Sequence, residues 1–191
     1  MVTKTYYSPT LEIAGAALFG ALSIVVSFSA AFIPRLPWGI ALLDPISIVW
    51  IVCFLIFGIR SGIICSVAGT IGLMFFDPFA PIGPFMKLAA TLPMMIIPLL
   101  ILRATREKGS SSGRDFASTK LWFSSGLIAT LVRIVIMLPL VIIVVSLLFG
   151  TPLMEIVTGV LILNAWQSAW DIAVPWIIVF PTKIYEKYCI W

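Results

Sequence analysis

Long apolar runs with few charges are the feature that most constrains how this chain can fold. Of its 191 residues, 61% are hydrophobic and only 10% are charged, whereas soluble domains are about 45–50% apolar. A helix that crosses a hydrocarbon core about 30 Å thick needs about 20 apolar residues. We therefore predict an all-α membrane protein, with a single integral membrane domain over residues 1–191.

The apolar runs predict a bundle of about six transmembrane helices. Their expected ranges are 9–33, 46–59, 63–76, 84–102, 121–149 and 157–184. The second and third runs fall near or below the usual minimum of about 17 residues, so either these helices extend into the loops or neighbouring helices partly shield them. The first run exceeds the roughly 7–15 apolar residues of a signal peptide and is expected to be a retained helix.

Two connections are predicted from glycine and polar residues. The segment Arg60-Ser61-Gly62 is expected to form the turn between the second and third helices. Residues 103–120 form the one extended polar stretch, and its Gly/Ser centre favours a flexible loop.

The basic residues predict the orientation of the helices. With the N-terminus inside, one group of basic residues falls on the inner side: Lys4, Arg60, Arg103, Arg106, Lys108, Arg114, Lys120, Lys183 and Lys187. Only Arg35 and Lys87 fall on the outer side. This positive-inside bias predicts that both termini are cytoplasmic. Because topology accounts for the basic residues, no nucleic-acid partner is expected.

The sequence lacks the residues that several classes of chemistry require. The chain has no histidine, and its three cysteines show no Cys-x-x-Cys spacing, so no metal site or disulfide framework is expected. It also lacks a phosphate-binding G-x-x-x-x-G-K-[ST] loop and a G-x-S-x-G elbow. We expect no cofactor and no enzymatic activity. An enzyme that uses Asp171 as an acid or base is the remaining alternative.

Arg133 and Asp171 lie within apolar runs, where an ionisable side chain costs at least about 2.5–3.5 kcal/mol. At about 1.5 Å per residue, each lies about 20 Å from the start of its helix, and the two helices run in opposite directions. The two side chains are therefore expected at the same depth. They could form a structural ion pair or contact a ligand.

Asn164, Gln167 and Asp171 follow one face of the last predicted span at i, i+3 and i+7. A polar row of this kind either lines a cavity or forms hydrogen bonds between helices. Trp166 and Trp170 border the row, where they could stack on a planar ligand, belong to an interfacial aromatic belt or simply pack.

Two further segments carry weaker signals. Lys87 follows a Pro- and Gly-rich turn, where it could pair with a ligand or extend towards the headgroups. In the first span, Ala17-x-x-x-Ala21 overlaps with Ala16-x-x-x-Gly20 to give a small-residue face that allows another helix to approach closely.

The chain resembles the S components, the substrate-capturing subunits of energy-coupling-factor (ECF) vitamin transporters. The resemblance covers nearly the whole chain. It rests on ALFGALSIV at 17–25, the LLDP loop at 42–45 and FGIRSGI at 57–63. The chain looks most like the riboflavin-type members, through APIGPFMKLAAT at 80–91, VRIVIM at 132–137, and Asn164 with Gln167.

This resemblance implies an importer subunit in the plasma membrane of a prokaryote. It would bind a vitamin from outside, with riboflavin or a related flavin as the best guess. The implied substrate-binding residues are Trp38, Leu43, Asp44, Ile82, Gly83, Lys87, Asn164, Gln167 and Asp171. Ala17 and Ala21 would dock on a transmembrane coupling protein, and two cytoplasmic ATPases would drive release. Pantothenate, pyridoxine and a queuosine precursor are alternative ligands, and a small membrane scaffold without a solute is the alternative function.

Overall fold

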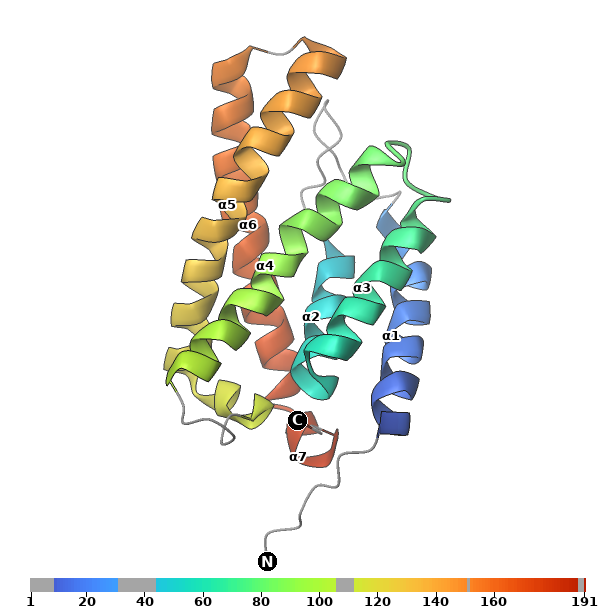
Figure 1. Cartoon of the computed structure of the whole chain (residues 1–191), viewed down its shortest axis with the longest axis vertical. Helices are drawn as coiled ribbons and strands as arrows, with labels where there is room; N and C mark the ends of the chain where they lie inside the picture. The colour runs from blue at the N-terminus through green and yellow to red at the C-terminus, as the bar shows by residue number, and fades with distance from the viewer. Residues whose placement is uncertain (1–8, 31–43, 106–111, 151, 189–190) are drawn as a thin grey trace, which may run out of the picture.

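The described part of the chain is all-helical, which confirms the predicted fold class at that level (Figure 1). The computed structural model describes residues 9–30, 44–105, 112–150, 152–188 and 191. The six long helices are α1 (Pro9–Ala30), α2 (Pro45–Phe57), α3 (Ile59–Leu73), α4 (Ile82–Thr105), α5 (Thr119–Phe149) and α6 (Leu153–Val179). Two short helices, η1 (Gly113–Ala117) and α7 (Ile184–Tyr188), complete the described elements.

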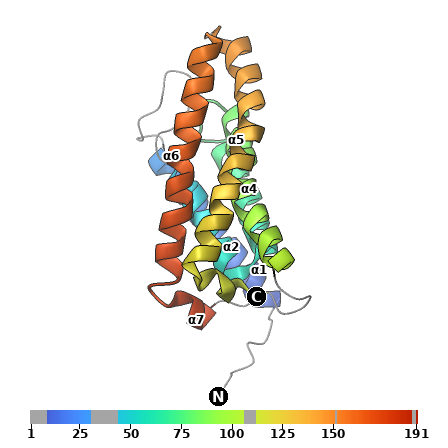
Figure 2. The same ribbon diagram turned by 90° about the vertical axis from the view of Figure 1, so that its left-hand side faces the viewer.

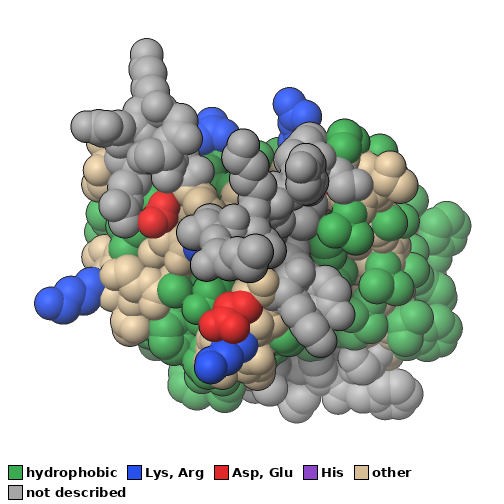
Figure 3. Space-filling view, turned by 90° about the horizontal axis from the view of Figure 1, so that it is seen from below, with side chains coloured by type: hydrophobic (Ala, Val, Ile, Leu, Met, Phe, Trp, Pro, Cys, Tyr) green, Lys and Arg blue, Asp and Glu red, His purple; other side chains and the backbone are tan. Residues whose placement is uncertain are grey.

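The long helices run alternately up and down the bundle (Figures 1 and 2). We call the end where α1 begins and α7 lies the terminal end, and the opposite end the distal end. Helices α5 and α6 reach farther at the distal end than the other four (Figure 1). The exposed basic side chains Arg60, Arg103, Arg114, Lys120 and Lys183 belong to segments at the terminal end. Figure 3 views this end and shows Lys and Arg side chains around its rim.

Helix α2 is short because it is enclosed by the other helices. Every residue from Trp50 to Phe57 is buried, and α2 contacts α1, α3, α4 and α6. Its side chains therefore form the centre of the main hydrophobic core, together with Met94 and Met95 of α4. A helix covered in this way does not need to span the hydrocarbon core by its own length.

Small residues bring α1 and α3 close together. A Cβ added at Gly20 would lie 3.2 Å from Ala68 Cβ, and one added at Gly72 would lie 2.5 Å from Ile24 Cγ1. Small residues allow such close approach between membrane helices. The two overlapping motifs of α1 therefore face different surroundings. Ala16 and Gly20 are buried in the bundle, whereas Ala17 and Ala21 are exposed.

The turn between α2 and α3 is at Gly58, so the turn predicted at Arg60-Ser61-Gly62 is wrong. Gly58 has φ +94°, a conformation that side-chain-bearing residues rarely adopt. Gly62 lies within α3 instead, where an added Cβ would be 2.9 Å from Phe54 Cβ. The sequence contains two glycines in this stretch, and only the first has the positive φ that ends a helix.

The last long helix ends earlier than predicted. Helix α6 stops at Val179, not near residue 184, and Phe180 caps it. Pro181 follows directly, and a proline can neither donate a helical hydrogen bond nor avoid the carbonyl four residues before it. The chain then turns at Lys183, which has φ +58°, and enters α7.

Part of the connection between α4 and α5 is anchored, so the prediction of a flexible loop is wrong for residues 112–118. Residues 106–111 lie outside the described residues. Phe116 of η1 is fully buried, and Trp176 Nε1 donates a hydrogen bond to its carbonyl at 3.0 Å. The Ser112 hydroxyl donates to the Trp191 carbonyl at 2.8 Å. Aromatic packing at the terminal end therefore holds this segment on the bundle.

Three of the described helices are long and apolar enough to cross a membrane. They are Pro9–Phe28, Ile82–Thr105 and Thr119–Leu148, whereas α2 and α3 are shorter apolar helices. Large apolar side chains on the outer face of α5 are strongly exposed, including Leu131, Val135 and Leu147. Such a surface is compatible with a location in a lipid bilayer.

Candidate functional site

Arg133 is the centre of a polar cluster in the middle of the bundle. Its side chain comes from α5 and is only 1% exposed. The guanidinium Nη1 donates to Asp171 Oδ2 at 2.6 Å, which forms the ion pair considered from the sequence. A buried charge of this kind is stable only when it is paired and hydrogen-bonded.

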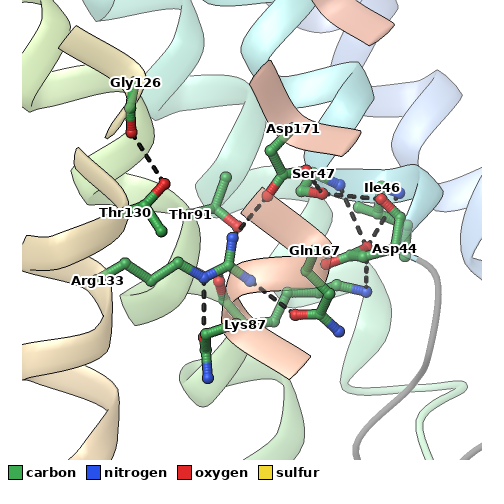
Figure 4. Close-up of polar contacts among 11 residues, drawn as sticks. Asp44, Ile46, Ser47, Lys87, Thr91, Gly126, Thr130, Arg133, Gln167 and Asp171 are labelled. Carbon is green, nitrogen blue, oxygen red and sulfur yellow. Dashed lines mark hydrogen bonds and ion pairs between the residues drawn. The ribbon is translucent and has the colours of Figure 1, made fainter. Parts of the chain in front are cut away.

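The polar row of α6 converges on this guanidinium. Arg133 Nε donates to Asn164 Oδ1 at 2.9 Å, and Nη2 donates to Gln167 Oε1 at 2.7 Å. The three partners lie on consecutive turns of one helix face, as their spacing requires. One arginine therefore holds together all three side chains of the row, and Figure 4 shows its contacts with Gln167 and Asp171.

Ser47 connects this cluster to α2. Its hydroxyl lies 2.5 Å from Asp171 Oδ1 and 2.8 Å from the Asp44 carbonyl (Figure 4). A serine hydroxyl carries a single proton, so it can donate to only one of these two acceptors at a time. The buried carboxylate is thus coupled to the first turn of α2.

Asp44 and Lys87 form a second ion pair nearer the distal end. Lys87 Nζ lies 2.7 Å from Asp44 Oδ1, with 16% of the lysine side chain exposed. The same carboxylate caps α2 by accepting from the backbone N–H groups of Ile46 and Ser47. Asp44 thereby combines the role of a helix cap with that of a counterion.

The cluster balances its charges but keeps hydrogen-bonding capacity. Arg133 and Lys87 are matched by Asp171 and Asp44. Among the described residues, the contacts of Arg133 use three of the five N–H donors of its guanidinium, which leaves one on each terminal nitrogen. The buried Ser168 hydroxyl, on the same helix as the polar row, has no partner among the described residues. Such donors suit carbonyl oxygens or ring nitrogens of a polar solute.

The structure brings together most but not all of the residues singled out from the sequence. Asp44, Lys87, Asn164, Gln167 and Asp171 share one continuous set of contacts with Arg133 and Ser47. Trp38 and Leu43 lie outside the described residues. Ala17 and Ala21 lie on the exposed face of α1, apart from the cluster.

Four other singled-out residues lie outside this set of contacts. Ile82 is 38% exposed, and a Cβ added at Gly83 would lie 3.0 Å from the Asp77 carboxylate, so this glycine permits a tight turn. Trp166 and Trp170 are exposed on α6 and pack edge to face against each other, with ring centroids 5.9 Å apart. Their position matches the alternative in which these tryptophans pack at the surface.

Sequence reasoning missed the role of Ser47 and the pairing of Lys87 with Asp44. The Asp44-Pro45 dipeptide does carry a usable signal, because an aspartate followed by proline is typical of a helix start. Ser47 stands alone between apolar residues and carries no such signal. No protein-family model and no curated protein sequence matches this chain.

Proposed function

We propose that this protein captures a small polar solute within the membrane and passes it to a partner for transport. The observation that supports this proposal is the polar cluster around Arg133, which gathers groups from α2, α4, α5 and α6 in a strongly apolar chain. Ionisable groups inside a bilayer are costly and usually mark solute pathways or binding sites. An arginine with two spare donors is well suited to hold a carbonyl-bearing ligand.

The solute would enter from the distal end, where Lys87 and Asp44 lie. Because Lys87 keeps part of its side chain exposed, it stands between the buried guanidinium and the surroundings. In this proposal, the Arg133–Asp171 pair is the fixed frame of the site. Gln167 and the spare N–H groups of Arg133 contact the ligand.

More specifically, we propose an S component of an ECF-type importer in a prokaryotic plasma membrane, with riboflavin or a related flavin as its solute. This proposal comes from the sequence resemblance and includes six spans with both termini cytoplasmic. The exposure of Ala17 and Ala21 is what a docking face for a transmembrane coupling protein requires. Two cytoplasmic ATPases would supply the energy.

A flavin titration tests solute capture. Quenching of riboflavin fluorescence by the detergent-purified protein should saturate at one site. Gln167→Leu removes a polar group next to Arg133 and should weaken binding by up to about tenfold, the upper end of the loss expected for a hydrogen bond between neutral groups. Trp170→Phe, at an exposed position on the same helix, is the matched control and should bind normally.

The outcome of the titration separates the candidate functions. Saturable binding of pantothenate or pyridoxine in place of riboflavin would retain solute capture and change the ligand. A folded protein that binds none of these solutes would contradict the proposal. It would favour a membrane scaffold, in which the internally balanced ion pairs only hold the helices together.

Partner docking is tested separately. Ala17→Trp with Ala21→Trp places two bulky rings on the exposed face of α1 and should abolish co-purification with the coupling protein and the ATPases. Riboflavin binding should persist, because both alanines lie apart from the polar cluster. Normal co-purification of the partners with this double variant would refute the docking role of α1.

A further inference from the structure

A groove between α4 and α5 differs in chemistry from the polar cluster. It has a volume of about 470 Å³ and opens to the outside of the bundle. Its wall on α4 runs from Ile82 to Leu92, with Pro81 just before the helix, and Leu140 of α5 closes the other side. Every lining side chain among the described residues is apolar, so these residues offer no hydrogen bond to a polar solute or a charged headgroup.

The groove lies on the far side of α4 from the polar contacts. A helix turns about 100° per residue, which places Phe85, Ala89 and Leu92 on one side of α4. Lys87 and Thr91 project from the other side, towards Asp44 and Arg133 (Figure 4). Whatever fills the groove is therefore separated from the candidate solute site by the width of α4.

The surroundings of the groove limit what can fill it. Both of its walls belong to helices that are long and apolar enough to cross a membrane. Phe85 is 58% exposed and Leu140 is 36% exposed, so both side chains face the medium around the bundle. For a membrane-spanning α4 and α5, that medium is the hydrocarbon of the bilayer.

The dimensions of the groove select a narrow, extended occupant. From Ile82 to Leu92, α4 rises by about 15 Å, which is half of a hydrocarbon core about 30 Å thick. Spread over that length, 470 Å³ corresponds to a mean width of about 6 Å. A helix of a partner protein or of a second copy is about 10–12 Å wide, so its backbone would stay outside the groove and only single side chains would enter it. One extended hydrocarbon chain within one leaflet would fill the groove along its length.

We propose that this groove is a binding site for one phospholipid acyl chain, taken from the leaflet at the distal end. The site recognises the chain and not the headgroup, because the part of the chain that the structure describes lines it with apolar side chains alone. By filling the gap beside α4, the bound chain supports the helix that carries Lys87. The inference does not depend on the proposed solute or transport partners.

Native mass spectrometry of the delipidated protein, titrated with palmitoyl-oleoyl phosphatidylglycerol, tests this site. The wild type should retain one lipid through detergent removal in the gas phase. Ala89→Trp fills the groove and should weaken retention by about tenfold, equivalent to the loss of about two buried methylene groups. Ala104→Trp, at an exposed alanine on the same helix outside the groove, should leave retention unchanged.

Two comparisons keep the test decisive. Phosphatidylcholine with the same chains should be retained to within about twofold of the retention of phosphatidylglycerol, because the groove contacts only the acyl chain. If Ala89→Trp does not fold, Leu140→Phe narrows the groove from the other helix and should weaken retention in the same direction. Equal retention by the wild type and the folded groove variants would overturn the proposal, as would retention governed by the headgroup.

Discussion

At the scale of single residues, Arg133 organises the site by binding several side chains at once. Its guanidinium is bound by three side chains of α6, and one of them, Asp171, is bound in turn by Ser47 of α2. The sequence predicted the shared depth of Arg133 and Asp171 from helical rise alone. It could not predict that Asn164 and Gln167 bind the same guanidinium, because that depends on how α5 and α6 are rotated about their axes.

Removal of one partner of this ion pair should destabilise the protein strongly. Asp171→Ala leaves the guanidinium buried without its counterion, which typically costs about 3–5 kcal/mol. Arg133→Met combined with Asp171→Leu removes both charges and should recover part of this loss, because apolar replacements of buried pairs are often tolerated. Thermal unfolding in detergent, followed by circular dichroism, measures both. A double variant no more stable than Asp171→Ala would contradict a coupled pair.

Gly69 should be intolerant of a side chain at the contact between α1, α2 and α3. A Cβ at this position would lie 2.6 Å from both Ser23 Oγ and Trp50 Nε1. We expect Gly69→Ala to lower the free energy of unfolding by about 1–3 kcal/mol, because the rigid indole cannot move away within a packed core. Gly20→Ala is the control, since its one close contact is 3.2 Å. Equal unfolding temperatures for the two variants would disprove the close packing at Gly69.

At the scale of elements, Trp191 holds η1 against α2. Its indole Nε1 donates to the Leu55 carbonyl at 3.2 Å, and its ring packs against Phe54 with centroids 5.3 Å apart. The Trp191 carbonyl accepts from Gly113 N at 3.0 Å. The sequence favoured a flexible loop here because the Gly/Ser composition of residues 103–120 gives no sign of a distant tryptophan that anchors part of it.

Loss of this anchor should expose the segment to proteolysis. Trp191→Ala removes the ring and the indole donor, so η1 should open more often and trypsin should cut faster after the exposed Arg114. Mass spectrometry of the fragments identifies this cut among others. Trp170→Ala removes an exposed tryptophan from α6 and should leave the rate unchanged. Unchanged cleavage after Arg114 in Trp191→Ala would mean that the aromatic contacts do not restrain η1.

Helix existence was more predictable than helix boundaries. Each of the six long apolar runs contains a described helix, because their length and hydropathy leave few alternatives. The helix boundaries depend on single residues, whose effect does not show in the average hydropathy of a run. Examples are Gly58, with its positive φ, and Pro181, which stops α6. Both ends of α2 therefore follow from single residues, the Asp44 cap and Gly58.

At the scale of the whole molecule, charge and topology together predict orientation. The exposed basic side chains Arg60, Arg103, Arg114, Lys120 and Lys183 cluster at the terminal end, whereas Asp77 and Glu155 lie at the distal end. Positive charge near the ends of spans is retained on the cytoplasmic side. The terminal end should therefore face the cytoplasm.

Cysteine labelling in cells tests this orientation. In a background with Cys189→Ser, Glu155→Cys at the distal end should react with a membrane-impermeant maleimide in intact cells. Lys183→Cys at the terminal end should react only after permeabilisation. Both positions are exposed, and the other two cysteines, Cys53 and Cys65, are buried. Labelling of Lys183→Cys in intact cells would reverse the predicted orientation.

Native mass spectrometry of freshly purified protein tests whether the cluster around Arg133 holds a solute. We expect an added small-molecule mass at one copy per chain, with a flavin absorbance spectrum if the solute is riboflavin. Gln167→Leu should lower the occupancy, whereas Trp170→Phe should not. A folded protein that carries no solute, and that acquires none from a panel of riboflavin, pantothenate and pyridoxine, would refute solute capture by this cluster.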